Sequence, residues 1–359
     1  MKDLTPQFDF DDLLIVPKVH TDITSRYKKI QLPERLPLFT APMDTVVNRD
    51  NMRTFIQNKI NVCLPRTIKY HDFLAREILL GQTKDDGIFI SMGFQDIEDE
   101  KRWHDFQNFH EGAHILIDVA NGHMEIIAEY AKYIKMHRPD IIIMVGNIAN
   151  PDTYLWYAES GCVDYIRVGI GNGGGCLTTK QSGVGYPMAS LIRAIRQIKD
   201  EYETSRYGGR LIAPAIIADG GMKDYVDVIK ALALGADYVM IGSMFNKAFE
   251  SCADNYLYGI KLNQKVAKYF FDKGYPIKKY FRGMSTKEAQ KAMGKTKFKT
   301  SEGVVRYRKV EYYLQGWVEN FEHYLRNAMS YSDAKTLEDF IGKADFCWIT
   351  KNGYDRFNK

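Results

Sequence analysis

Residues 113–147 read AHILIDVANGHMEIIAEYAKYIKMHRPDIIIMVGN. Both ends of this stretch, residues 113–119 and 141–146, are short, mostly apolar runs rich in β-branched side chains. Between them lies MEIIAEYAKYIKMHR, whose apolar residues repeat with the period of a helix. Apolar strands on either side of an amphipathic helix are typical of a parallel sheet with both faces covered. The stretch therefore predicts a strand–helix–strand unit.

The same alternation continues along the chain in both directions. Predicted strands lie at residues 36–40, 60–64, 87–92, 113–119, 141–146, 165–169, 211–218 and 238–242. The segments between them carry helical patterns, as in YVDVIKALALGA. Eight such units predict an α/β fold, a closed (β/α)8 TIM barrel over roughly 250 residues. An open, doubly wound sheet is the structural alternative.

Polar or glycine-rich segments follow six of the predicted strands. In barrel enzymes the active residues lie at the C-terminal ends of the strands, so these segments should gather on one face. They are APMDT (41–45), DVANGH (118–123), GN (146–147), the loop at 171–187, ADGG (218–221) and IGS (241–243). Asp44 and Asn147 are weaker candidates on the same rim.

The composition limits the classes of partner. The chain has 359 residues, 45% of them hydrophobic and 26% charged, with a net charge of +4. This charge is mild and offers no concentrated basic stripe for nucleic acid. No apolar run reaches the length of a membrane span, and the start, MKDLTPQFDFDD, lacks the apolar core of a signal peptide. We expect a cytoplasmic protein with neither nucleic acid nor membrane as partner.

The five cysteines are odd in number, widely spaced and without a CxxC pair, which argues against a disulfide framework and a structural zinc site. Cys176 stands out because four of the five residues before it, GNGGG at 171–175, are glycine. Glycines let backbone N–H groups point inward and a substrate approach closely. Cys176 is therefore a candidate nucleophile. The others are expected to be small buried packing residues, namely Cys63, Cys162, Cys252 and Cys347.

The regular alternation weakens after residue 245. Residues from about 265 to 309 are rich in Lys, Gly, Tyr and Phe and are too long for a plain connection, which favours a mobile flap or lid. A helical C-terminal tail follows, EYYLQGWVENFEHYLRNAM. The expected organisation is a single catalytic barrel domain over residues 1–359.

Several motifs occur in an order that resembles the IMP dehydrogenase/GMP reductase family. They are FDFDDLLIVPK, APMDT, GNGGGCLTT, IADGG, the IGS after the eighth strand, RGMS and a later SEG. The resemblance covers residues from about 8 to 350 and implies a (β/α)8 barrel, in agreement with the strand count. Relatives with a regulatory CBS module carry it after the second strand, and the spacing between residues 64 and 87 leaves no room for it.

The resemblance implies covalent chemistry on a purine nucleoside monophosphate. Cys176 would attack C2 of the purine ring and form a thioimidate-type intermediate. Thr178 and Glu302 would form a pair that manages protons on the purine or the leaving group. The carbonyls of Gly171, Gly173 and Cys176 would bind a monovalent cation such as K⁺.

The same resemblance implies the substrate and cofactor contacts. Asp219 would accept hydrogen bonds from the ribose 2′- and 3′-hydroxyls, although ADGG alone could be a turn with an Asp N-cap. The remaining positions are the phosphate cradle of Gly220, Gly221, Gly242 and Ser243, the base segment Gly283, Met284 and Ser285, the nucleotide contacts Lys299 and Ser301, and the nicotinamide-facing segment Asp118, Ala120, Asn121 and Gly122.

Three residues depart from the family pattern. Gly174 stands where relatives carry a Ser that contacts the nucleotide phosphate, and Gly175 stands where a bulkier apolar residue is common. Lys299 replaces the usual Arg, which alters a nucleotide contact. Without the Ser, backbone N–H groups would have to bind the phosphate.

The flap separates the two reactions of the family. The dehydrogenase oxidises IMP with NAD⁺ and then uses a flap Arg–Tyr pair to activate water, which gives XMP. Here residues 285–301, STKEAQKAMGKTKFKTS, contain neither Arg nor Tyr, and DVANGH and GVGYP also resemble the reductase. A GMP reductase that uses NADPH and releases IMP and ammonia is favoured, and the relatives imply a homotetramer.

Two alternatives stay open. The first is the dehydrogenase, because APMDT is closer to its motif and an Arg306–Tyr307 pair follows Glu302. A more ordinary role for this pair is a solvated position in a strand-like RYRKV run. A barrel that binds purine nucleotides without turnover would also fit the substituted positions Gly174, Gly175 and Lys299.

Overall fold

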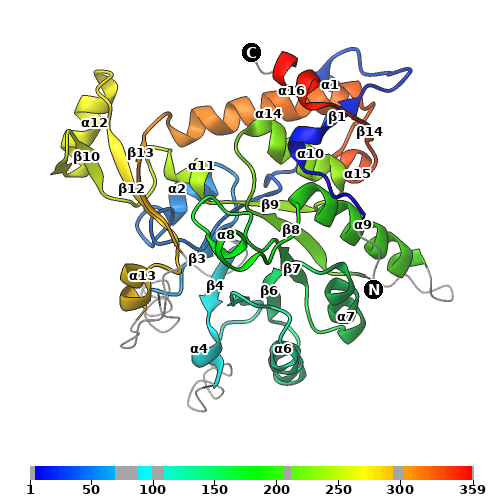
Figure 1. Cartoon of the computed structure of the whole chain (residues 1–359), viewed down its shortest axis with the longest axis horizontal. Helices are drawn as coiled ribbons and strands as arrows, with labels where there is room; N and C mark the ends of the chain where they lie inside the picture. Colours follow the sequence, from blue (N-terminus) through cyan, green and yellow to red (C-terminus); the bar gives the residue numbers. More distant parts are fainter. Residues whose placement is uncertain (1–4, 69–86, 99–108, 205–211, 294–302, 358–359) are drawn as a thin grey trace.

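Eight parallel strands form the centre of the molecule (Figure 1). The structure is a computed structural model that describes residues 5–68, 87–98, 109–204, 212–293 and 303–357. Neighbouring strands follow the order β2, β9, β8, β7, β6, β5, β4, β3. Their bounds are β2 (Leu38–Thr40), β3 (Val62–Leu64), β4 (Ile88–Met92), β5 (His114–Asp118), β6 (Ile142–Ile148), β7 (Tyr165–Val168), β8 (Ala215–Asp219) and β9 (Tyr238–Ile241). All eight predicted strands are confirmed.

The barrel closes between β2 and β3. Phe39 and Asn61 form a parallel bridge there. The amide of Thr40 donates to the carbonyl of Asn61 at 2.9 Å, and the amide of Asn61 donates to the carbonyl of Leu38 at 3.0 Å. The ring is thus continuous, which confirms the (β/α)8 barrel and rules out the open sheet.

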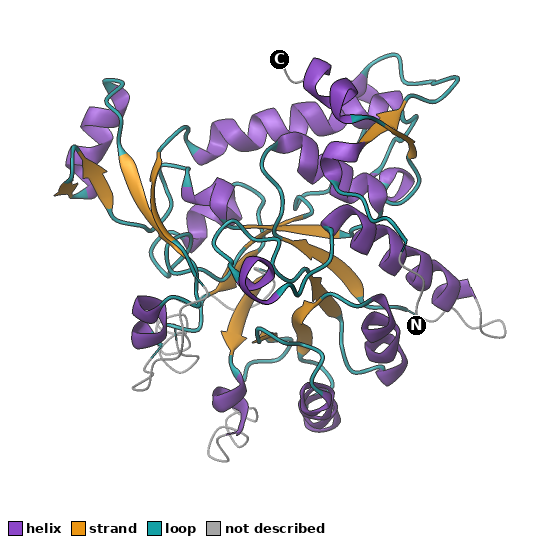
Figure 2. Cartoon of the chain, viewed as in Figure 1, coloured by secondary structure: helices purple, strands orange, loops and turns teal. Residues whose placement is uncertain are grey.

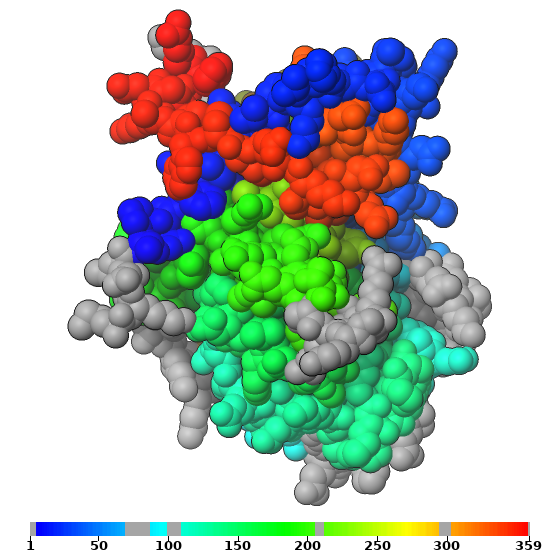
Figure 3. Space-filling model, turned by 90° about the vertical axis from the view of Figure 1, so that its right-hand side faces the viewer, coloured from blue at the N-terminus to red at the C-terminus, as the bar shows by residue number. Residues whose placement is uncertain are grey.

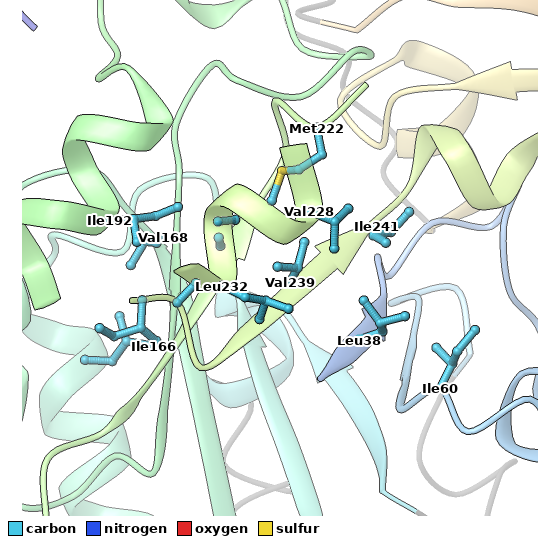
Figure 4. Packing of buried hydrophobic residues seen from close by; sticks show 14 of the residues in the cluster. Leu38, Ile60, Ile166, Val168, Ile192, Met222, Val228, Leu232, Val239 and Ile241 are labelled. Carbon is cyan, nitrogen blue, oxygen red and sulfur yellow. The ribbon is translucent and has the colours of Figure 1, made fainter. Parts of the chain in front are cut away.

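Side chains alternate between the barrel interior and its outer face, as the period of a strand requires. The interior holds a buried cluster of Phe39, Leu116, Met144, Ile217 and Met240 with their neighbours. A larger cluster joins the outer faces of the strands to the surrounding helices. In Figure 4, Val228 and Leu232 of α10 (Tyr225–Leu234) lie close to Val239 of β9.

Helices surround the strands (Figure 2). Helix α7 (Pro151–Ser160) shows ordinary capping chemistry: it begins after the N-cap Asn150 with Pro151 in its first turn, and Gly161, with a φ of 64°, caps its C-terminal end. The other helices on the barrel include α2 (Met52–Gln57), α4 (Phe94–Glu98), α6 (Glu125–His137), α9 (Met188–Thr204) and α11 (Ser243–Asn246). Within the described residues, no helix has the length and apolar character that crossing a membrane requires.

An antiparallel sheet of four strands follows the barrel and projects from it (Figure 1). Its order is β11 (Ile260–Leu262), β10 (Asn255–Leu257), β12 (Lys278–Arg282) and β13 (Val305–Lys309), accompanied by α12 (Gln264–Asp272) and α13 (Lys287–Ala292). Phe249, Leu257, Ala267, Ile277 and Val310 form its small core. We call this unit the outer sheet. It contains the described part of the segment expected to be a flap, and its motion stays a prediction.

The two chain ends meet on one side of the barrel. The predicted helical tail is confirmed as α14 (Leu314–Tyr331). Beyond it, β14 (Asp345–Trp348) pairs antiparallel with β1 (Leu13–Val16), and Lys18 forms an ion pair of 2.6 Å with Asp345. Figure 3 shows the blue N-terminal and red C-terminal segments against one another. The smaller helices of this region are η1 (Phe10–Asp12), α1 (Arg26–Lys29), α15 (Leu337–Phe340) and α16 (Lys351–Phe357).

The cysteines are all free, but of the four expected to be buried packing residues only Cys63 is fully buried. Cys63 is buried in the barrel interior, as expected, while Cys162 and Cys252 are partly buried. The expectation for Cys347 is wrong, because it is exposed. It lies on β14, which belongs to a surface sheet of two strands and presents most of its side chains to solvent.

Candidate active site

Three glycine-containing segments meet at the C-terminal end of the barrel. The amide of Val304 donates to the carbonyl of Gly175 at 3.1 Å, and the amide of Gly283 donates to the carbonyl of Val304 at 3.1 Å. Cys176 also forms an isolated antiparallel bridge with Gly303. The glycine–cysteine loop after β7, the RGMS motif after β12 and the residues after Glu302 are therefore held together by backbone hydrogen bonds.

The closeness of these segments requires glycine. A Cβ atom on Gly283 would lie 2.6 Å from the carbonyl oxygen of Gly175, and one on Gly303 would lie 2.7 Å from a methyl group of Thr286. Side chains do not approach so closely without a shift of the backbone. Met284 and Ser285, the other residues expected to hold the base, follow Gly283 and are partly buried.

Cys176 lies at the centre of this arrangement. Its sulfur is 3.2 Å from the hydroxyl oxygen of Thr178, and its amide donates to the carbonyl of Gly173 at 2.9 Å. Thr178 is the first residue of the short helix α8 (Thr178–Ser182). The structure thus brings together two of the three residues that the sequence suggested for catalysis. The third, Glu302, lies outside the described residues, as do Lys299 and Ser301.

The loops after β8 and β9 border the glycine–cysteine loop. A Cβ atom on Gly220 would lie 2.8 Å from the amide nitrogen of Gly173, and Gly220 has a φ of +88°. Gly221 has a φ of +92°. Ser243, which follows Gly242 after β9, has its hydroxyl 3.9 Å from the Cβ position of Gly174. Three of the four residues expected to form a phosphate cradle, Gly220, Gly221 and Ser243, therefore lie beside this loop. The fourth, Gly242, directly precedes Ser243.

Asp219 is partly buried and carries several hydrogen bonds. Its Oδ2 atom accepts from the side-chain amide of Asn147 at 2.8 Å and from Nε of Arg167 at 3.0 Å. The sequence-based alternative, in which this residue caps the next helix, is wrong. That helix, α10, is capped by Asp224, whose side chain accepts from the first-turn amides.

Arg167 joins Asp219 to Asp118 inside the barrel. Its Nη1 atom lies 2.6 Å from Oδ1 of Asp118, and Nε of Arg66 lies 2.9 Å from Oδ2 of the same carboxylate. The result is a chain of two carboxylates and two guanidinium groups in which every charge has a partner of opposite sign. Such pairing is the condition under which buried charges are tolerated.

Neighbouring charges fix the ionisation states of Asp118 and Arg167. Burial opposes ionisation of Asp118, but Arg66 and Arg167 outweigh it and hold the pKa of Asp118 below its usual value. Burial likewise opposes the charge of Arg167, but Asp219 and Asp118 outweigh it and raise the pKa of Arg167. Asp118 is therefore ionised, and it acts as a buried anchor for the two arginines.

Of the four residues expected to face the cofactor, two are buried and two are exposed. Asp118 is 8% exposed and Gly122 is buried, with its amide donating to the carbonyl of Asn147 at 2.8 Å. Ala120 and Asn121 are exposed at the rim that follows β5. Of this segment, these two residues present the greatest accessible surface to an incoming molecule.

Sequence reasoning missed four arginines of the site, and one of them is Arg66, which binds Asp118. Arg167 carried a signal, because it is a charged residue within the apolar strand segment YIRVG. Arg282 follows the buried Phe281 and binds Asp44, with Nε 3.3 Å from Oδ1 and Nη2 in contact with Oδ2. Burial opposes the charge of Arg282, and Asp44 outweighs it and raises the pKa of Arg282. Arg308, on β13, lies in the strand-like RYRKV run, where the sequence pattern suggests a role only for the Arg306–Tyr307 pair.

Comparison with known proteins gives consistent matches along most of the chain. A family model described as "IMP dehydrogenase / GMP reductase domain" matches residues 97–357. A GMP reductase of Caenorhabditis elegans is 27% identical, over 98% of this chain and 94% of the relative. GMP reductase 2 of Homo sapiens is 28% identical over 96% and 95% of the two chains, and GMP reductase 1 of Mus musculus is 28% identical over 96% of each.

Proposed function

Because the chain belongs to the IMP dehydrogenase/GMP reductase family, we propose that it is a GMP reductase, which converts GMP and NADPH to IMP, ammonia and NADP⁺. The observation that carries the proposal is the position of Cys176. Its sulfur lies 3.2 Å from the Thr178 hydroxyl, where the glycine–cysteine loop meets Gly303. A thiol placed beside a proton-carrying group is suited to covalent catalysis.

The proposed reaction has two steps at C2 of the purine. The thiolate of Cys176 forms a bond to C2, and the 2-amino group leaves as ammonia after it receives a proton through Thr178 and Glu302. NADPH, when bound, supplies the hydride that C2 then receives. The carbon–sulfur bond breaks with its electrons returning to sulfur, and IMP leaves.

The loops around Cys176 provide the contacts for the nucleotide. Asp219, with its side chain 16% exposed, is proposed to accept the ribose hydroxyls while Arg167 and Asn147 hold its other contacts. Gly220, Gly221, Gly242 and Ser243 are proposed to bind the phosphate, and Gly283, Met284 and Ser285 to bind the base. Lys299 and Ser301 are assigned to the nucleotide by the family resemblance alone.

The cofactor segment has features that suit NADPH. Ala120 is small and exposed, so a flat ring can approach the backbone there, and the exposed Asn121 offers an amide to a carboxamide group. Asp118 and Gly122, which are buried, flank these two exposed residues and hold the segment in place. NADPH is proposed over NADH because the family reaction that fits the flap composition uses it.

A monovalent cation is also part of the proposal. Carbonyl oxygens are the donors that K⁺ prefers. Gly173 uses one lone pair of its carbonyl for the amide of Cys176, and a second lone pair stays for a cation. The carbonyls of Gly171, Gly173 and Cys176 are therefore proposed to hold K⁺.

The outer sheet argues against the dehydrogenase alternative. Arg306 and Tyr307 are both exposed on β13. The ring of Tyr307 contacts Tyr256 at 5.1 Å and Tyr280 at 5.7 Å on neighbouring strands. Tyr307 thus packs on the surface of the sheet beside the exposed Arg306, and no feature of the described residues links the pair to the activation of water.

A comparison of substrate pairs tests the proposal. Absorbance in the nicotinamide band is followed with GMP and NADPH in one cuvette and with IMP and NAD⁺ in another. We expect consumption of NADPH with GMP. Formation of NADH from IMP would establish the dehydrogenase instead, and tight nucleotide binding without turnover in either cuvette would establish a binding protein.

The family also supports a cytoplasmic homotetramer as the functional form. Light scattering coupled to size-exclusion chromatography measures the mass directly, and a mass four times that of one chain is expected. A mass equal to one chain at enzyme-assay concentrations would refute the tetramer.

A further inference from the structure

Arg308 is a partly buried cation without a neutralising partner among the described residues. Its Nε atom is buried and has no hydrogen-bond partner in the described structure. Burial lowers the pKa of Arg308, and the neighbouring Arg306 lowers it further, whereas Glu311 opposes them. An anion would stabilise a guanidinium group in this condition, because a charge that has lost part of its hydration without gaining a partner is costly.

The guanidinium group is held in a defined plane. Its central carbon lies 4.3 Å from the centroid of the Phe281 ring, and Phe281 is 1% exposed. β12 and β13 pair with Lys279 opposite Arg308 and Phe281 opposite Arg306, so Arg308 and Phe281 share one face of the sheet. Stacking on a fixed ring leaves the N–H groups at the edge of the guanidinium free to bind an anion.

Arg308 points into the region where the glycine–cysteine loop meets the loop after β9. A Cβ atom on Gly174 would lie 3.4 Å from Nη2 of Arg308 and 3.9 Å from the hydroxyl of Ser243. A guanidinium, a hydroxyl and a backbone without a side chain therefore come together from three separate elements. This set of donors matches the oxygens of a phosphate monoester.

We propose that Arg308 binds the phosphate group of the nucleotide, together with Ser243 and the backbone at Gly174. In naming a nucleoside monophosphate as the carrier of that phosphate, the inference rests on the proposed function. The absence of a side chain at Gly174 gives the guanidinium the room it needs, so that the arginine takes the place of the hydroxyl that relatives carry at this position.

Calorimetric titrations with GMP, guanosine and inorganic phosphate test the inference. In Arg308→Met we expect GMP binding to weaken roughly 10- to 100-fold, the effect of losing hydrogen bonds to a charged group. Binding of inorganic phosphate should be lost, and the affinity for guanosine, which has no phosphate, should stay unchanged. The matched control is Arg306→Met, which removes the same charge from an exposed position on the same strand and should change GMP affinity less than about threefold.

Two outcomes would overturn the inference. One is wild-type affinity of Arg308→Met for both GMP and phosphate, and the other is an equal loss of affinity for GMP and guanosine. Should Arg308→Met fail to fold, Arg308→Lys keeps the charge but lacks the planar fork, and wild-type GMP affinity in that variant would also overturn it. Binding of phosphate that depends on Arg308, in a protein that does not turn over GMP, would refute the proposed function and leave the role of Arg308 standing.

Discussion

Asp219, at the rim of the barrel, is expected to act both in nucleotide binding and in the stability of the fold. From the sequence alone, Asp219→Ala is expected to weaken nucleotide binding far more than folding. The structure adds a second effect, because Arg167 depends on both Asp118 and Asp219 for its charge balance. Removal of one carboxylate leaves a buried positive charge in excess.

We therefore predict that Asp219→Ala lowers the free energy of unfolding by about 2–4 kcal/mol in addition to weakening GMP binding. Asp219→Asn keeps an oxygen that accepts from Asn147 and should cost less stability than the alanine variant. Chemical denaturation of both variants measures the effect. Equal stability of Asp219→Ala and the wild-type protein would show that Arg167 does not need this carboxylate.

An ion pair links the barrel to the outer sheet. Arg282 at the end of β12 binds Asp44 in the loop after β2 through two contacts, and both side chains are largely buried, at 16% and 14% exposure. This pair is the direct charged link, within the described residues, between the outer sheet and the APMDT segment. It holds the segment expected to be a flap against the rim.

For Arg282→Met we predict faster hydrogen exchange at the amides of β12 and β13, because the ion pair with Asp44 is gone. Lys278→Met is the control, since Lys278 is exposed on the same strand. Exchange should accelerate several-fold in the first variant and stay unchanged in the second. Identical exchange in both variants would mean that backbone pairing alone holds the outer sheet.

Helix α10 contains a buried carboxylate, that of Asp227. Asp227 is 5% exposed, and burial raises its pKa to about 6, although the amide of Lys223 donates to it at 2.8 Å. Between its usual pKa of 3.8 and a pH near 6, the folded state holds a proton on Asp227 that the unfolded state has released. Its contribution to stability is therefore greatest at low pH and falls as the pH rises through this window.

We predict that the stability of Asp227→Asn relative to wild type rises by roughly 2–3 kcal/mol between pH 4 and pH 7, because asparagine never has to ionise inside the protein. Urea denaturation at several pH values gives the difference between the two proteins. A difference that does not change with pH would show that Asp227 titrates normally in the folded state.

At the scale of the whole molecule, the barrel could be predicted from the sequence because its signal is local. Strands such as residues 113–119 are short, mostly apolar runs, and a segment with helical periodicity follows. The rim segments follow because chain order places every strand end on the same face. Cys176 and Thr178 could be predicted as a pair because both belong to one short motif. In the structure, the sulfur of Cys176 lies 3.2 Å from the hydroxyl oxygen of Thr178.

Other features of the fold had no clear local signal in the sequence. The pairing of β1 with β14 joins positions more than three hundred residues apart, as in Leu13 opposite Trp348. The strands β10 and β11 have only 3 residues each and are too short for a periodic pattern. The position of Arg308 beside Gly174 depends on how the outer sheet packs on the rim, which no spacing in the sequence encodes.

The central claim is that the sulfur of Cys176 forms a bond to the purine, and the GMP-dependent oxidation of NADPH by Cys176→Ser tests it most directly. We predict that this variant binds GMP with near-wild-type affinity but loses at least about a thousandfold in rate, as expected when a covalent nucleophile is removed. Cys162→Ser, which changes a partly buried cysteine away from the rim loops, should keep the wild-type rate. Oxidation of NADPH at the wild-type rate by Cys176→Ser would contradict the account.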